Sequence, residues 1–198
     1  MTMRAHPIAV NFRGTSGSGK TTLAREVMKL YELPSSTCFR EKRKRPIMTL
    51  HMPKRPGRLL AVLGHYEAAC GGCDTITELD DVFGLVREQL GQGHNVMFEG
   101  LILSGEIIRT EKLVMDHELH ILALTTPVAD CIANVSARRV ARGAPAEFKH
   151  KNTTAKARCV ELTMNRLQPT VVAAANGGEA VWMSFDQALL RTRELLGV

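Results

Sequence analysis

Eight residues near the start of the sequence have the types and spacing needed to hold the phosphates of a nucleotide. They match the pattern GxxxxGK[ST], in which glycines let backbone N–H groups turn toward an anion. In this pattern the lysine reaches the β- and γ-phosphates and the following hydroxyl binds Mg²⁺. Thr22, next along the chain, could donate to the α-phosphate. We therefore predict an ATP·Mg²⁺ site formed by Gly14, Thr15, Ser16, Gly17, Ser18, Gly19, Lys20, Thr21 and Thr22.

Two carboxylates are candidates for the remaining chemistry of phosphoryl transfer, which requires charge neutralisation and a group that orients the nucleophile. Glu99 ends an apolar run, Val96–Phe98, where a metal-directed acid is expected, and Gly100 follows it. Asp74 follows a glycine pair and could accept the proton of an acceptor hydroxyl. The alternatives are that Glu99 is a solvated glutamate in a turn and that Asp74 caps a helix beside Thr75. The sequence does not decide which of the two acids is the base.

Arginines near residue 140 could stabilise charge on a transferring phosphoryl group. Arg138 and Arg142 are spaced i, i+4 on an expected helix, and Arg139 lies between them. Kinases of this topology often hold such arginines in a mobile lid, so we predict catalytic roles for Arg138 and Arg142 before Arg139. The alternative is a solvated helix end favoured by the helix dipole.

The positive charge is concentrated in one segment of the chain. Arg40–Arg58 contains eight basic residues and one acid, giving +7 within a formal net charge of +6, so the rest sums to −1. Dense like charge favours a polyanionic partner such as DNA, although a solvated basic loop is the alternative. The candidate DNA contacts are Lys42, Arg43, Lys44, Arg45, Lys54, Arg55 and Arg58.

The five cysteines do not indicate a disulfide framework, because their number is odd and the pattern is not that of a small secreted domain. Cys70 and Cys73 form a C-x-x-C pair, but no second pair completes a zinc site. We interpret the segment as a glycine-shaped active-site loop that contains thiols.

Alternating strands and helices would position these groups. The glycine loop, Asp74 and Glu99 each follow an apolar strand, and the carboxyl ends of parallel strands meet at one edge of a sheet. The expected strands are Ile8–Phe12, Leu59–Leu63, Asn95–Phe98, Leu119–Leu124 and Ala180–Ser184, with a short Ile47–Met52 strand possible in an otherwise irregular Arg40–Arg58. The expected helices follow the glycine loop up to about Pro34 and then cover Thr75–Leu90, Gly105–Met115, Pro127 to about Arg142, residues 155 to about 167, and Phe185–Leu196.

This alternation predicts an α/β protein with the P-loop kinase fold: a parallel five-stranded sheet flanked by helices on both faces. A chain of 198 residues fits a single domain, residues 1–198, with a basic insert at about 38–58 and a lid at about 136–154. No apolar run approaches a membrane span, and no apolar signal region precedes the first strand, so we expect a cytoplasmic protein.

Together, these motifs resemble the 5-hydroxymethyluracil DNA kinases of bacterial viruses, which are relatives of thymidylate kinase. The resemblance spans roughly residues 8–145 and depends on Gly14–Thr22, Gly64–Tyr66, Gly71–Thr75 and Asn95–Gly100. It implies phosphorylation of the hydroxymethyl group of a modified uracil already in DNA. That phosphate then serves as a leaving group in thymidine hypermodification, which shields viral DNA from host restriction. Glu99-Gly100 stands where thymidylate kinases have an Asp-Arg pair, which disfavours a free-nucleotide acceptor.

Two other functions remain open at this stage. A nucleotide kinase of the thymidylate type, or another small-molecule kinase, would show activity independent of polymer length. An ATP-dependent binding module or switch would hydrolyse ATP without a phosphorylated product.

Overall fold

The computed structural model describes residues 5–39, 46–67, 72, 73, 76, 78–100 and 105–198. The described strands are β1 (Ala9–Arg13), β2 (Tyr31–Phe39), β3 (Pro46–Pro53), β4 (Leu60–Leu63), β5 (Asn95–Glu99), β6 (Leu119–Leu124) and β7 (Gly178–Met183). The described helices are α1 (Lys20–Met28), α2 (Leu79–Gly91), α3 (Glu106–Asp116), α4 (Val128–Val140), α5 (His150–Ala173) and α6 (Phe185–Leu196).

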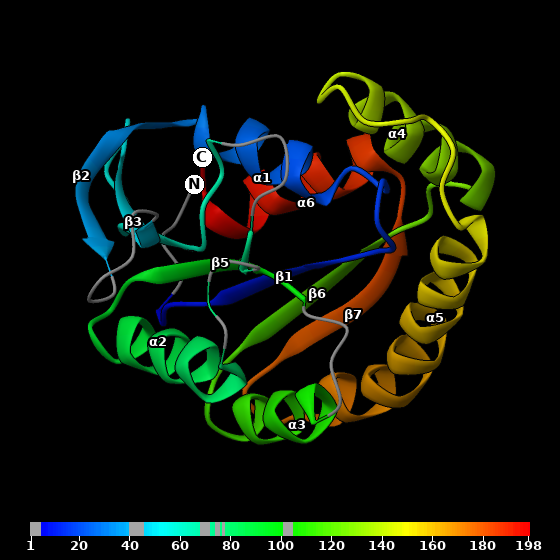
Figure 1. Ribbon diagram of the computed structural model, residues 1–198. Coiled ribbons are helices and arrows are strands. Elements are labelled where there is room, and N and C mark those ends of the chain that lie inside the picture. Colours follow the sequence, from blue (N-terminus) through cyan, green and yellow to red (C-terminus); the bar gives the residue numbers. More distant parts are fainter. Residues whose placement is uncertain (1–4, 40–45, 68–71, 74–75, 77, 101–104) are drawn as a thin grey trace.

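The strands form a mixed sheet of seven strands in the order β2-β3-β4-β5-β1-β6-β7, so the predicted five-stranded, all-parallel sheet is wrong. The five strands β4, β5, β1, β6 and β7 are parallel to one another, whereas β3 is antiparallel to both β2 and β4. The error arises at β2, which the sequence analysis did not predict. The α/β class is confirmed, since helices cover both faces of the sheet (Figure 1).

β2 was missed because it lacks the pattern by which a strand is recognised. Eight of its nine residues are exposed, and Pro34 lies within it. A proline is tolerated on an edge strand, where one N–H need not pair. The pairing of β2 with β3 shifts register between Tyr31 and Pro34 and again between Pro34 and Ser36, which accommodates the ring. Only its hydrogen bonds to β3 identify β2 as a strand.

His51 of β3 joins the two strands of this hairpin. Its Nδ1 lies 3.2 Å from Glu32 O and its Nε2 lies 2.9 Å from Thr49 Oγ1. A carbonyl oxygen can only accept, so Nδ1 carries the proton and Nε2 accepts from the threonine hydroxyl. Burial lowers the pKa of His51, while its hydrogen bond to Glu32 acts in the opposite direction.

We expect acid to destabilise the protein through His51. Because the pKa of His51 is lower in the folded than in the unfolded state, the unfolded chain binds more protons below about pH 6.5, and stability falls as the pH decreases. Denaturant unfolding measured from pH 7.5 to pH 5 should show this decline. The slope should be smaller in His51→Gln, and an identical slope in the variant would contradict the assignment. His117, whose pKa is also lowered chiefly by burial, should account for part of the remaining slope.

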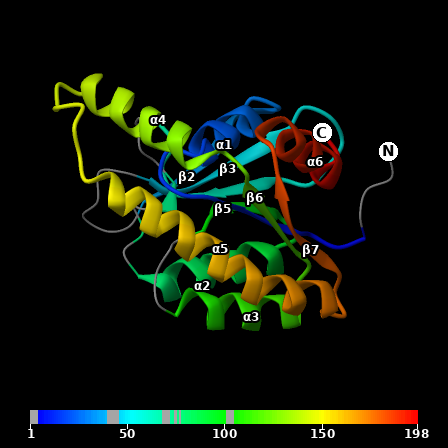
Figure 2. The same cartoon turned by 90° about the vertical axis from the view of Figure 1, so that its right-hand side faces the viewer.

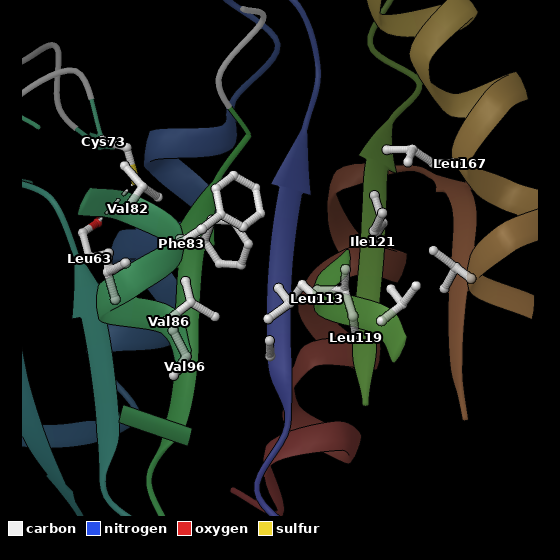
Figure 3. Close-up of a cluster of buried hydrophobic side chains, with 14 of the residues drawn as sticks. Leu63, Cys73, Val82, Phe83, Val86, Val96, Leu113, Leu119, Ile121 and Leu167 are labelled. Carbon is white, nitrogen blue, oxygen red and sulfur yellow. Dashed lines mark hydrogen bonds between the residues drawn. The ribbon is translucent and has the colours of Figure 1, made fainter. Parts of the chain in front are cut away.

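Two apolar clusters fix the helices on the two faces of the sheet. α1 and α6 pack on one face, whereas α2, α3 and α5 cover the other (Figures 1 and 2). Figure 3 shows Val82, Phe83 and Val86 of α2 beside Val96 of β5 on this second face. Phe83 also meets Phe98 edge to face, with ring centroids 6.2 Å apart. Each such side chain, once buried, contributes about 1.5–3 kcal/mol.

Several predicted helix boundaries are corrected. The described α2 begins at Leu79, and the predicted start at Thr75 lies outside the described residues. Before the helix, Ile76 N donates to Cys73 O. α4 ends at Val140, so Arg142 lies in the following turn and does not share a regular helical face with Arg138. The predicted lid at 136–154 contains the end of α4, a connection and the start of α5 at His150. No helix in the described ranges is long and apolar enough to span a bilayer.

Candidate active site

The glycine loop joins the carboxyl end of β1 to α1 in a conformation that requires glycine. Gly17 has φ of 86°, and a Cβ at this position would collide with the carbonyl oxygen of Cys131 in α4. Gly19, with φ of 102°, is the N-cap of α1. An L side chain adopts such angles only at an energetic cost. The backbone of α4 therefore excludes any side chain from the middle of the loop.

Lys20 lies over the loop from the first position of α1. Its Nζ donates to Gly14 O at 2.8 Å and to Thr15 O at 3.1 Å. Thr21 follows in the same turn and is partly buried. The loop amides, the positive end of the helix dipole and the ammonium group together form a set of donors that suits a polyphosphate. The residues present thus fit the nucleotide phosphates predicted from the sequence.

Residues just before α4, within α4 and at the start of α5 hold the loop from outside. Thr126 Oγ1 donates to Ser18 O at 2.8 Å, and Asn134 Nδ2 donates to Gly17 O at 2.9 Å. On the other side, Thr15 Oγ1 donates to Thr153 O at the start of α5, at 3.1 Å. Of these three partners, Thr153 belongs to the segment 136–154 that was predicted to be a lid.

One lysine that the sequence pattern does not reveal also reaches this loop. Lys156 of α5 donates through Nζ to Ser16 Oγ at 3.5 Å. Nothing in the local sequence marks this exposed helical lysine, and only the fold brings α5 to a loop 140 residues earlier in the chain. Beside it, a cavity of about 580 Å³ is lined by Gly14, Thr15 and residues of α5, Arg158 among them. Both cations add positive potential next to the phosphate loop.

Glu99 lies at the carboxyl end of its strand, as the sequence predicts, and that strand is next to the one that leads into the glycine loop. It ends β5, pairs in register with Phe12 of β1, and is only 7% exposed. Gly100 N donates to Phe12 O at 2.9 Å, which continues the ladder past the carboxylate. The two strand ends therefore present Glu99 and the loop at the same edge of the sheet.

A second pair of glycines brings another loop against Glu99. A Cβ on Gly72 would lie 2.8 Å from the carboxyl carbon of Glu99, and Gly72 has φ of 84°. His65 N donates to Gly72 O at 3.2 Å, and Gly72 N donates to His65 O at 2.8 Å. A Cβ on Gly64 would collide with the backbone of Gly72. This bridge between the Gly64 and Gly72 segments holds the chain after β4 over the carboxylate.

The other candidate base, Asp74, lies outside the described residues, as does Cys70. Cys73 is described and buried, and its Sγ lies 3.8 Å from Leu63 O. Across the described ranges, no cluster of three or more His, Cys, Asp or Glu side chains is placed to hold a metal ion. The choice between Asp74 and Glu99 as base thus stays a prediction.

A known protein matches most of this chain. The 5-hmdU DNA kinase of Pseudomonas phage PaMx11 is 39% identical over 175 residues, which cover 85% of this chain and 91% of the relative. The chain belongs to the 5-hmdU DNA kinase family. It is therefore a kinase, and the resemblance inferred from its motifs is confirmed. No protein-family model matches the chain.

In this family member the predicted lid arginines have different surroundings. Arg139 Nε donates to Pro145 O at 2.8 Å, and its guanidinium carbon lies 5.9 Å from the centroid of the Phe148 ring. Arg139 therefore has a structural role in the connection after α4. Arg138 is partly exposed, and Arg142 is exposed in the turn beyond the helix. Catalytic roles for Arg138 and Arg142 stay predictions.

The basic residues predicted to contact DNA are only partly described in this kinase, and those that are described do not lie together. Lys42, Arg43, Lys44 and Arg45 lie outside the described residues. Lys54 Nζ donates to Lys29 O at the end of α1, at 2.8 Å, and Arg55 is exposed. Arg58 donates to Gly93 O at 3.2 Å and Ala5 O at 2.8 Å. These carbonyls precede β5 and β1. Arg58 therefore lies where these strands begin, at the end of the sheet opposite the glycine loop.

A buried ion pair at the end of β1 was likewise not predicted from the sequence. Arg13 donates through Nη2 to Glu106 Oε1 at 3.1 Å, and both side chains are about 5% exposed or less. The Arg13 side chain also covers Gly100, where a Cβ would lie 3.0 Å from its Cγ. The only signal in the sequence is a charge at the end of an apolar strand directly before the glycine loop. Removing either partner would leave a buried charge at a cost of about 3–5 kcal/mol.

Proposed function

We propose that this P-loop kinase transfers the γ-phosphoryl group of ATP to the hydroxymethyl group of 5-hydroxymethyluracil within DNA. The match to a 5-hmdU DNA kinase over 85% of the chain carries this proposal. The site supports it, because a glycine loop, a lysine and a nearly buried carboxylate converge at one edge of the sheet. In the viral genome this phosphate would be the leaving group for further modification of the base.

The residues of the site divide the task in this proposal. The amides of Gly14–Thr22 and the ammonium of Lys20 hold the phosphates of ATP, and Thr21 and Glu99 would hold Mg²⁺. The metal commonly takes one or two protein ligands together with phosphate oxygens, and it neutralises charge as the phosphoryl group moves. Asp74 or Glu99 accepts the proton of the acceptor hydroxyl. At the same time the oxygen of that hydroxyl bonds to the γ-phosphorus, and ADP leaves. Arg138 and Arg142 supply positive charge from the lid.

The test offers ATP labelled at the γ-phosphate to three acceptors in parallel. These are DNA containing 5-hydroxymethyluracil, the same DNA with thymine, and free 5-hydroxymethyl-deoxyuridine nucleotides. We expect label on the modified DNA alone. Label on the free nucleotide but not on the DNA would contradict the proposal and would favour the alternative function of a nucleotide kinase. ATP hydrolysis with no labelled acceptor would favour the binding module.

Neutralising the basic cluster Lys42–Arg45 should weaken DNA use while leaving ATP binding unchanged. The slope of log affinity against log salt should decrease by roughly one for each DNA phosphate that the variant no longer neutralises, because fewer counterions are released. The measurement is the KM for modified DNA at several salt concentrations. Lys112→Gln with Arg166→Gln, two basic positions on α3 and α5, gives the matched control. An unchanged salt slope in the cluster variant counts against its role on DNA.

A further inference from the structure

A second cavity, of about 630 Å³, lies beside α1 and is separate from the cavity at the glycine loop. Its walls come from the end of α1, the β2–β3 hairpin and the loop after β4. Its volume is within the range of pockets that take a nucleotide-sized ligand. The residues that matter for its chemistry are Arg25, Tyr31, Lys54, His65 and Tyr66.

Two polar groups in this wall have no hydrogen-bond partner among the described residues. They are the hydroxyl of Tyr31 and the Nδ1 of His65, whose residues are 3% and 7% exposed. Burial raises the pKa of Tyr31 far above its usual value, so its hydroxyl stays protonated and can donate. A buried polar group without a partner is costly, and a ligand with a complementary polar edge would remove that cost.

The backbone connects the wall of this cavity to the carboxylate of Glu99. Val62 of β4 pairs with Met97 of β5, so Gly64 lies level with Glu99. The next residue, His65, is bridged through its backbone to Gly72, whose Cα lies against the Glu99 carboxylate. A group bound against His65 is therefore next to the chain segment that covers Glu99.

Basic side chains line the cavity together with the aromatic ones. Arg25 Nε donates to Tyr66 O at 2.8 Å, and Lys54 Nζ donates to Lys29 O at 2.8 Å. Lys29 lines the cavity too and pairs with Glu26 at 2.7 Å. Glu32 and Glu67 are the acids in the lining, so three cations face two acids. Aromatic surface with a cationic excess suits a base attached to a phosphodiester backbone.

We propose that this cavity receives the acceptor base, a 5-hydroxymethylpyrimidine turned out of the DNA, with its polar edge on Tyr31 and His65. The inference rests on the proposed function and names where the acceptor binds. The Tyr31 hydroxyl donates to the O4 carbonyl, and His65 Nδ1 accepts from the N3–H of uracil. Cytosine has an amino group in place of O4 and an unprotonated N3, so in this arrangement Tyr31 would lose its acceptor and His65 its donor. The pair would thus favour uracil over cytosine.

The test uses Tyr31→Phe and His65→Asn with duplexes that carry one 5-hydroxymethyluracil or one 5-hydroxymethylcytosine. For each variant we expect kcat/KM for the uracil duplex to fall about tenfold or more, with the KM for ATP unchanged. The preference for uracil over cytosine should fall as well. Tyr31→Phe removes only an oxygen that lacks a described partner, so this variant should fold. His117→Asn, at the end of α3, is the matched control.

The outcomes separate this inference from the proposed function. If the wild-type enzyme does not label the uracil duplex, the proposed function falls. If the wild type labels it and both variants have wild-type kcat/KM and base preference, the function stands and this inference falls. Equal reductions for ATP and for DNA would assign the two side chains to stability and would also overturn it.

Discussion

Replacing Lys20 with alanine is expected to lower phosphoryl transfer by about a thousandfold. The ammonium of Lys20 lies over Gly14 O and Thr15 O at the mouth of the glycine loop. The charge that develops on the transferring phosphoryl group is largely neutralised by such fixed cations, so the effect should appear in kcat. The measurement is single-turnover transfer from γ-labelled ATP to DNA containing 5-hydroxymethyluracil.

Lys112→Ala is the matched control for Lys20→Ala. Lys112 is an exposed lysine on α3 and lines neither the cavity at the glycine loop nor the cavity beside α1, so its removal should leave kcat within about twofold of the wild type. If Lys20→Ala folds and keeps more than a tenth of wild-type kcat, the glycine loop does not hold the transferred phosphate as proposed.

Replacing Glu99 with glutamine should reduce kcat by about a hundredfold to a thousandfold. The change keeps the shape of the side chain but removes a negative charge from a nearly buried position beside Gly72. A Mg²⁺ titration and a pH profile of kcat then separate its two proposed roles. If Glu99 binds the metal, the variant needs more Mg²⁺. If Glu99 is the base, the acidic limb of the pH profile disappears.

Glu88→Gln on α2 is the control for Glu99→Gln, since Glu88 is an exposed carboxylate away from the strand ends. It should change neither the Mg²⁺ requirement nor the pH profile. Wild-type kcat in a folded Glu99→Gln protein would exclude both proposed roles and leave Asp74 as the candidate base.

The elements that could be predicted from sequence are those with a strong local pattern. β6 at Leu119–Leu124 and α6 at Phe185–Leu196 match their predicted ranges, because an apolar run interrupted only by His120 marks the strand and a capping serine marks the helix. β2 has neither kind of signal, and its existence depends on pairing with β3. The sheet was therefore predicted too small and wholly parallel, since the two unpredicted antiparallel pairings both involve this hairpin.

The site shows the same division between local and long-range information. The glycine loop and Glu99 are found from sequence because their types and their place at a strand end are local properties. The contact of Gly72 with Glu99 and the contact of Lys156 with Ser16 join residues far apart in the chain. Likewise, the sequence shows the charge of Arg58 but not that Gly93 O and Ala5 O accept its hydrogen bonds.

The exposed edge strand β2 also has a consequence for the order in which the protein opens. Tyr31 is the only buried residue in β2, so this strand, unlike β3, has little apolar surface to hold it against the sheet. A unit with few buried contacts opens locally at a lower free energy than the whole molecule. Amide hydrogens of β2 should therefore exchange with solvent long before those of β1, β5 and β6. The wall of the proposed base cavity would then belong to the least stable part of the sheet, and occupancy of that cavity would slow its exchange.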